Sequence, residues 1–177
     1  MKKNNLILTI VLLTVILFST SGYAQTVTIG TQVWTSKNLD VATYRNGDVI
    51  PQVQDENAWA NLTTGAWCYY NNDASNGTKY GKLYNWYAVN DPRGLAPKGY
   101  HIPTDEEWTK LSDYLGGESE AGTKMKSTSG WYNNGNGTNS SGFSGLPGGS
   151  RHDNGSLFSI DYFGIHSCIN PLVYFTK

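Results

Sequence analysis

The sequence predicts an α+β fold with two main helices, a small antiparallel sheet and long ordered loops. One observation is a strongly marked amphipathic helix at residues 104–115. Another is a series of short runs in which polar and apolar residues alternate, which is the pattern of half-buried strands. The third is composition, since aromatic residues make up 13% of the 177-residue chain and charged residues only 15%. This balance suits an extracellular chain whose loops pack around aromatic rings.

The helix at residues 104–115 has signals at both ends. Thr104 is a suitable N-cap and Glu107 stands three residues later, so the two side chains can form a capping box. Apolar residues recur at spacings of three and four and form one face: Trp108, Leu111 and Leu115. Gly116 then provides a stop that tolerates a left-handed backbone. We predict structural roles for these residues, and for Trp34 and Trp86.

Extended segments precede this helix. Residues 26–29 and 32–34 alternate in polarity around Gly30, which predicts a first hairpin. Asn46-Gly47 is a strong turn signal between the extended runs 41–44 and 49–53.

The middle of the chain mixes several kinds of element. Residues 67–70 are typical of a short strand and residues 71–77 of a polar loop. Residues 80–89 predict a short helix that buries three side chains: Leu83, Trp86 and Tyr87.

After the main helix, residues 118–127 predict a second helix with Ala121 and Met125 facing inward. Residues 127–153 form a long segment rich in Gly, Asn and Ser, in which aromatic residues argue for order.

Residues 1–24 have the features of a secretory signal peptide. Lys2 and Lys3 precede an apolar run at residues 6–18, and small residues lead to a cleavage site after Ala24. The alternative is a membrane anchor, but the run is shorter than the roughly 20 residues that span a bilayer. Cleavage leaves 11 basic against 14 acidic residues, a formal charge of −3. No basic stripe is present, so nucleic acid is not expected as a partner.

Several motifs together identify a family resemblance. They are Trp34, Asn38-Leu39, YGKLYNWYAV at 80–89, GLAPKGYHIPTDEEW at 94–108 and SGFSGLPGGSR at 141–151. With these motifs the chain resembles the Fibrobacter succinogenes major paralogous domain, found in secreted and surface proteins of Bacteroidetes-type bacteria. It is more distantly similar to the formylglycine-generating sulfatase-modifying fold. Both resemblances imply a C-type-lectin-like architecture, with the domain at residues 25–158.

The C-terminal tail, residues 159–177, departs from the family pattern. The family continues with a Trp-Ser-Ser strand and closes with a strand carrying Arg-Cys, and neither is present here. The resemblance therefore implies incomplete C-terminal strands and an unpaired sheet edge, through either truncation or a shifted reading frame. Cys68 and Cys168 can pair in an oxidising compartment. However, Cys168 does not match the late cysteine of the family, which makes this disulfide doubtful.

The residues that could act in catalysis or bind a metal also have structural explanations. Asp105 and Glu106 suit the first turn of the helix, and His101 suits a structural role before it. The sulfatase-modifying enzymes use cysteine late in the fold, and this chain lacks a matching pair, so we do not expect an enzyme. Oxygen ligands gather in one loop as weak calcium candidates, although a polar turn explains them better: Asn71, Asn72, Asp73 and Asn76. No other cofactor is expected.

Composition fits a binding module best. The region that carries ligands in C-type-lectin-like folds contains six candidate residues: Trp131, Asn133, Asn134, Asn139, Arg151 and Asp153. The alternative is that Trp131 and Phe143 are core and the asparagines form turns. We expect a secreted or cell-surface (or periplasmic) non-catalytic module that binds glycan or protein. The alternatives are a degenerate, truncated paralogue without activity and an enzyme related to the sulfatase-modifying fold.

Overall fold

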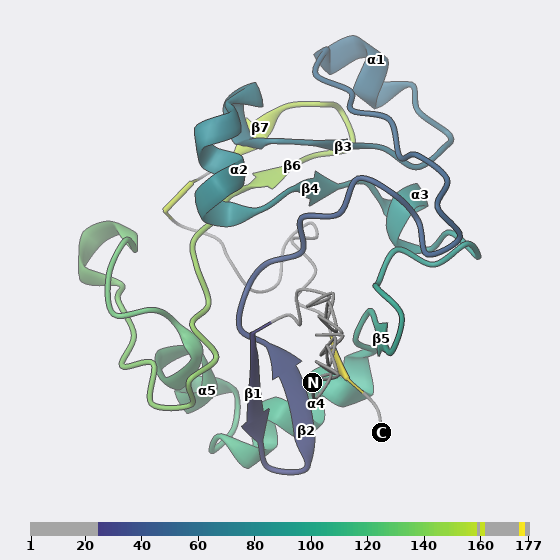
Figure 1. Ribbon diagram of the computed structural model, residues 1–177. Coiled ribbons are helices and arrows are strands. Elements are labelled where there is room, and N and C mark those ends of the chain that lie inside the picture. The colour runs from purple at the N-terminus through teal and green to yellow at the C-terminus, as the bar shows by residue number, and fades with distance from the viewer. Residues whose placement is uncertain (1–24, 159, 162–173, 176–177) are drawn as a thin grey trace, which may run out of the picture.

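The computed structural model describes residues 25–158, 160 and 161, and the backbone of residues 174–175 (Figure 1). The fold mixes helices with small antiparallel sheets, as an α+β chain does. The helices are α1 (Glu56–Ala60), α2 (Ala74–Tyr80), α3 (Trp86–Val89), α4 (Asp105–Tyr114) and α5 (Glu118–Met125), with single 3₁₀ turns at Tyr70–Asn72 and Tyr132–Asn134. The strands are β1 (Thr26–Ile29), β2 (Gln32–Thr35), β3 (Trp67–Cys68), β4 (Leu83–Tyr84), β5 (Tyr100–His101), β6 (Ser150–Arg151), β7 (Leu157–Phe158) and β8 (Tyr174–Phe175).

The largest sheet has the order β1-β2-β8-β5 and is antiparallel throughout. The predicted hairpin is confirmed as β1 and β2. The backbone of Tyr174 pairs with Trp34 on one side and with His101 on the other. The tail therefore supplies an inner strand between β2 and β5, so the expectation that incomplete C-terminal strands leave an unpaired edge is wrong at this position. Backbone pairing needs no particular side chain, so a divergent sequence can close the sheet without the family motifs.

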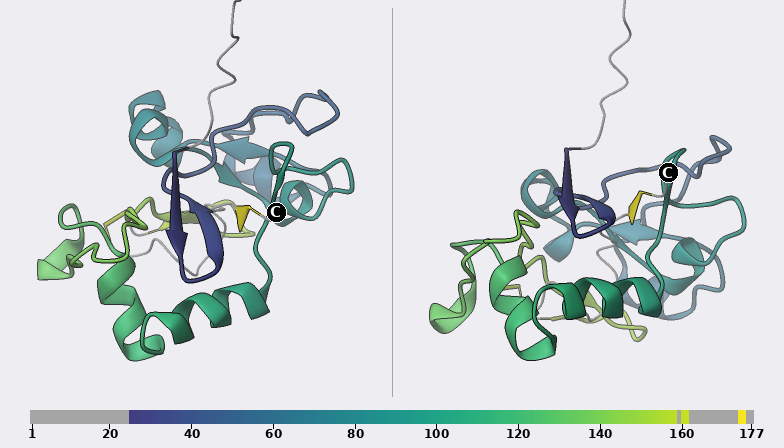
Figure 2. Two further views of the ribbon diagram at one scale, coloured as in Figure 1. Left: turned by 60° about the horizontal axis from the view of Figure 1, so that its bottom comes forward. Right: turned by 90° about the horizontal axis from the view of Figure 1, so that it is seen from below.

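Helix α4 lies across the turn end of the hairpin (Figures 1 and 2). It has the capping box that the sequence predicts: the Glu107 amide donates to Thr104 Oγ1 at 3.3 Å, and the Thr104 amide donates to Glu107 Oε2 at 2.9 Å. The Gln32 side chain adds a bond to the Glu107 carbonyl at 3.0 Å. These contacts fix the helix against β2.

The core between hairpin and helices joins residues far apart in the sequence. Its buried members are Ile29, Trp34, Leu111, Leu115, Ala121, Met125 and Phe143, with Trp108 packed against them. The ring centroids of Trp34 and Trp108 are 4.8 Å apart, and those of Trp34 and Phe143 are 5.8 Å apart. Phe143 is fully buried, so the long segment after α5 is ordered by a ring that it inserts into this core. The second predicted helix is confirmed as α5, with Ala121 and Met125 inward.

The segment predicted as one helix at residues 80–89 is divided. It contains the end of α2, strand β4 and the new helix α3, which Asn85 caps by accepting the Ala88 amide at 3.0 Å. Leu83 is buried, but Trp86 is 63% exposed and Tyr87 45% exposed. The predicted structural role of Trp86 in the core is therefore wrong, because the new cap turns Ala88 inward instead.

The polar loop predicted at residues 71–77 also differs from the structure, since helix α2 begins at Ala74. Asp73 caps this helix by accepting the Ser75 amide at 2.8 Å. A Cβ on Gly77 would lie 2.1 Å from the Tyr69 ring. Glycine, a weak helix former, is needed here because the helix packs directly on this ring.

The predicted signal peptide and the possible disulfide partner Cys168 lie outside the described residues. Cys68 is a fully buried free thiol, and burial raises its pKa. Among the helices of the described part, none has the length and apolar character to span a membrane.

Candidate functional site

The six predicted binding residues do not form one site. Trp131 is buried, with its Nε1 donating to Ser127 Oγ at 3.0 Å and Lys126 Nζ 4.7 Å from its ring centroid. Asn139 directs both side-chain atoms to Ser144, accepting from its amide at 2.7 Å and donating to its hydroxyl at 2.9 Å. Both residues serve the internal order of the loop, which agrees with the alternative that the sequence left open.

Arg151 has a structural position that excludes contact with a ligand. Its side chain is buried, and its guanidinium lies 4.3 Å from the Trp59 ring centroid. It donates to the carbonyls of Gly155, Val53 and Gln54 at 2.8–2.9 Å, and to that of Asp55 at 3.2 Å. Arg151 thus ties the β6–β7 turn to the chain entering α1, and a ligand-binding role is wrong for it.

The remaining candidates are exposed but separated. Asn133 and Asn134 have positive φ angles of 49° and 60°, the left-handed conformation that asparagine tolerates in turns. They follow Trp131 beside α5, whereas Asp153 lies in the β6–β7 turn and accepts the Asn154 amide at 2.8 Å. Figure 1 places these two turns at different sides of the molecule.

The weak calcium candidates are used in local structure. The Asp73 carboxylate caps α2, and Asn76 and Asn72 donate to the carbonyls of Tyr70 and Gln54. Asn71 has a positive φ of 53° within the adjoining 3₁₀ turn. The described residues contain no group of three His, Cys, Asp or Glu side chains placed to hold a metal ion. These side chains therefore serve the cap of α2 and the adjoining 3₁₀ turn.

The structure instead shows exposed aromatic rings on α3. We define the α3 surface as Trp86 and Tyr87 together with the neighbouring charged side chains of Asp48, Asp91 and Arg93. Single exposed apolar side chains are normal on protein surfaces, but here two large exposed rings are consecutive in sequence.

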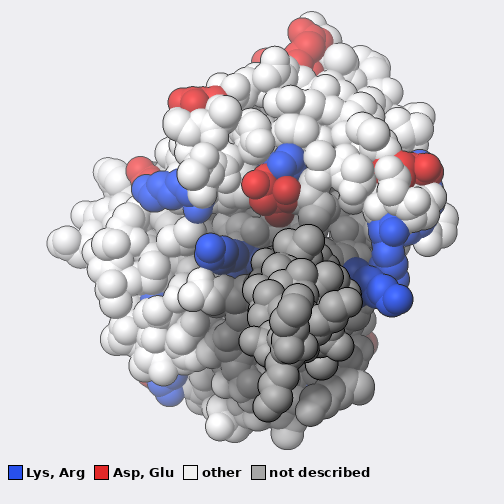
Figure 3. All heavy atoms as spheres, in the orientation of Figure 1, with Lys and Arg blue, Asp and Glu red and all other residues white. Residues whose placement is uncertain are grey.

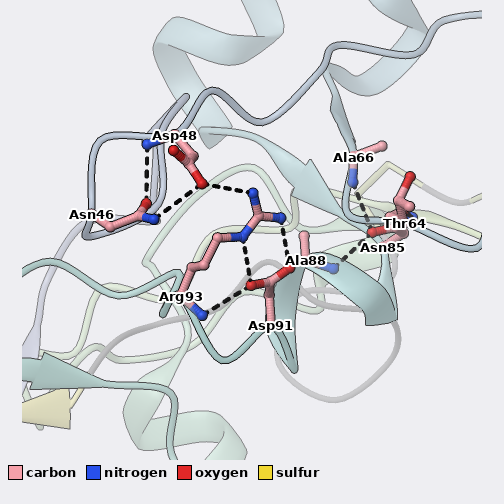
Figure 4. A network of polar contacts seen from close by, with 8 residues as sticks. All are labelled: Asn46, Asp48, Thr64, Ala66, Asn85, Ala88, Asp91 and Arg93. Carbon is pink, nitrogen blue, oxygen red and sulfur yellow. Dashed lines mark hydrogen bonds and ion pairs between the residues drawn. The ribbon is translucent and has the colours of Figure 1, made fainter.

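The base of the α3 surface is held firmly (Figure 4). The Asn85 side chain accepts from the amides of Ala88 and Ala66 at 3.0 and 2.9 Å, and donates to the Thr64 carbonyl at 2.8 Å. Ala88 lies on the inner face of the helix and is fully buried, in the same core cluster as Tyr44. Because the helix is fixed at its cap and at its inner face, the two rings are presented on a rigid support.

Charged groups border α3 on the side of its C-terminal end. Arg93 bonds the Asp91 carboxylate and the Asp48 carboxylate at 2.9 and 3.0 Å, and its guanidinium lies 4.0 Å from the Tyr44 ring centroid. The hydrogen bonds from Arg93 lower the pKa of Asp91 from 3.8 to about 2, and also lower the pKa of Asp48. Burial raises the pKa of Tyr44. Both carboxylates are therefore ionised at neutral pH; the side chain of Asp48 is 52% exposed, whereas Asp91 is 14% exposed and both its oxygens bond Arg93.

This arrangement suits binding rather than bond breaking. Flat apolar ring faces lie on the same helix-and-loop unit as carboxylates and a guanidinium, which combines stacking with directional hydrogen bonds. Sequence reasoning missed it by placing both rings in the core. A local signal was Asn85, a good N-cap residue that stands directly before the two rings.

One comparison with known proteins gives a match. The model of the Fibrobacter succinogenes major domain matches residues 27–167. The match extends beyond Phe158, where the sequence placed the end of the domain. No curated protein and no solved structure matches the chain.

Proposed function

Because the chain belongs to the Fibrobacter succinogenes major domain family, we propose that it is a secreted or cell-surface, non-catalytic module that binds glycans through the α3 surface. The observation that carries this proposal is the exposure of Trp86 and Tyr87 on a helix whose cap and inner face are fixed. Sugar rings offer C–H faces that pack on aromatic rings, and hydroxyls that bond carboxylates and guanidinium groups.

Export is supported by the basic and apolar pattern of residues 1–24. We infer a C-type-lectin-like arrangement from the resemblance of the motifs, and a small antiparallel sheet with long ordered loops is compatible with it. The α3 surface lies outside the region, residues 131–153, that the resemblance implies for ligands, so its proposed role rests on the exposed rings.

A non-catalytic role is supported by the way the sequence's acid–base candidates are used. Glu107 completes the capping box of α4, and His101 Nε2 lies 2.8 Å from its carboxylate. Asp105 and Glu106 stand in the first helical turn, where the helix dipole favours negative charge. These contacts give each group a structural purpose.

A glycan array probed with the purified protein tests the proposal. We expect reproducible binding to a subset of glycans, lost in Trp86→Ala and kept in Tyr114→Ala, which removes an equally exposed ring on α4. Absence of glycan binding, or equal binding by both variants, would contradict the proposal. Capture of a protein ligand through Trp86 in the absence of any glycan signal would favour the protein-binding alternative.

A further inference from the structure

A cleft of about 720 Å³ lies apart from the α3 surface. Its walls come from four segments: residues 25–27 at the start of β1, 36–40 after β2, 77–81 at the end of α2, and 142–146 of the long loop. The volume falls in the range of small-molecule sites, roughly 300–1,000 Å³. Because the walls belong to parts far apart in the sequence, the cleft is a product of the tertiary fold.

The cleft has an excess of positive charge. Its one lining carboxylate, Asp40, is already paired with Lys82, which also donates to the Asp40 carbonyl at 3.1 Å. Lys37 and Lys79 line the cleft as well, and within the described residues neither has a carboxylate partner. Figure 3 shows basic side chains in the region between α2 and the upper end of the hairpin. This excess is notable on a chain whose formal net charge is −1.

The uncharged lining groups are polar and already oriented by the backbone. Asn38 donates to the Tyr80 carbonyl at 2.8 Å, Ser36 donates to the Gln25 carbonyl at 3.0 Å, and Thr78 donates to the Ala74 carbonyl at 3.4 Å. In each of these bonds the side chain is the donor, so its oxygen atom can still accept a hydrogen bond from a ligand. Val27 and Leu146 add apolar wall. Fixed acceptors beside two ammonium groups suit a ligand that carries hydroxyl donors and a negative charge.

We propose that this cleft binds a carboxylate-bearing sugar unit, a hexuronate, with Lys37 and Lys79 as the charge partners of the carboxylate. A simple inorganic anion would leave most of the cleft and its hydroxyl acceptors unused. A neutral sugar would make no use of the two exposed ammonium groups, of which that of Lys79 lies 4.7 Å from the Tyr80 ring centroid. The proposal does not rest on the α3 surface, so either site can fail while the other stands.

Calorimetric and NMR titrations of the purified full chain with D-galacturonate, D-galactose and sulfate test this proposal. We expect galacturonate to bind, with an affinity that falls as salt rises, and to shift the amide resonances of Asn38 and Gly81. Lys79→Gln and Lys37→Gln are each expected to weaken binding about tenfold, while Lys110→Gln on α4 and Trp86→Ala leave it unchanged. All four side chains are on the surface, so unchanged melting temperatures will show that folding is preserved.

Three results would overturn the proposal. Equal binding of galactose would exclude a role for the carboxylate. Equal binding of sulfate would show an anion site without sugar recognition. Galacturonate binding that both lysine variants retain would place the ligand elsewhere.

Discussion

The guanidinium of Arg93 holds the carboxylate of Asp91 at two points, with Nε 2.9 Å from one oxygen and Nη2 2.9 Å from the other. A two-point pair fixes direction as well as distance, which a single ammonium contact cannot do. Since Asp91 follows α3 directly, this pair fixes the chain at the C-terminal end of the helix. The rigidity of the α3 surface therefore depends on it.

Replacing Arg93 with lysine is expected to loosen this end of α3 while keeping the charge. A lysine ammonium cannot bond Asp91 and Asp48 at the same time, and it lacks the planar group that stacks on the Tyr44 ring. We expect faster hydrogen exchange at the amides of Asn90 and Gly94, and a lower melting temperature. Lys110→Arg on α4 serves as the control, and unchanged exchange in Arg93→Lys would show that the two-point pair does not hold the helix.

Stability is expected to depend on pH through Asp91. Its pKa is lowered from 3.8 to about 2 in the folded chain by the bonds from Arg93. A carboxyl with a lowered folded pKa stabilises the protein above its unfolded pKa and loses that contribution as pH falls through the folded value. Urea unfolding should therefore show Asp91→Asn less stable than wild type at pH 6, with the difference shrinking between about pH 4 and pH 2. A difference that stays constant over this range would refute the assignment.

Arg151 is expected to be among the most sensitive positions for folding. It is buried and supplies hydrogen bonds to four carbonyls, which Arg151→Ala would leave without donors. Leaving a buried acceptor without its donor costs about 1–3 kcal/mol of unfolding free energy, and four carbonyls lose theirs here. Chemical denaturation should show this loss, whereas Asp153→Ala in the exposed turn should stay within about 0.5 kcal/mol of wild type. A small loss in Arg151→Ala would contradict the structural role.

Phe143 is expected to hold the long loop after α5 in place. Its ring is fully buried beside the Trp34–Trp108 pair, with its centroid 5.8 Å from that of Trp34 and 6.0 Å from that of Trp108. Phe143→Ala should lower the unfolding free energy by about 3–5 kcal/mol, the usual cost of removing a core phenylalanine. Tyr132→Ala, at a ring that is 55% exposed in the same loop, should cost much less. Similar losses in the two variants would mean that the loop is not anchored by Phe143.

The sequence was sufficient where the signals are local. Helix α4 was predictable because its cap, first-turn charges and apolar spacing all lie within about a dozen residues. The hairpin at β1 and β2 was predictable for the same reason. Its glycine turn and its alternating polarity are adjacent in the chain.

Residues whose surroundings come from distant segments were not predictable. The partners of Arg151 at Val53, Gln54 and Asp55 lie 96 to 98 residues away along the chain, so nothing near Arg151 marks it as buried. The exposure of Trp86 has a local cause instead, because Asn85 caps a new helix that turns Ala88 inward. The pairing of the tail at β8 also depends on backbone contacts that no side-chain motif records.

Calorimetry on the strongest glycan from the array measures directly whether Trp86 contributes to glycan binding. Trp86→Ala should weaken the affinity at least tenfold, about 1.4 kcal/mol, while the melting temperature stays at the wild-type value. Tyr114→Ala should leave the affinity unchanged. If Trp86→Ala binds the same glycan within twofold of wild type, the α3 surface is not the binding site.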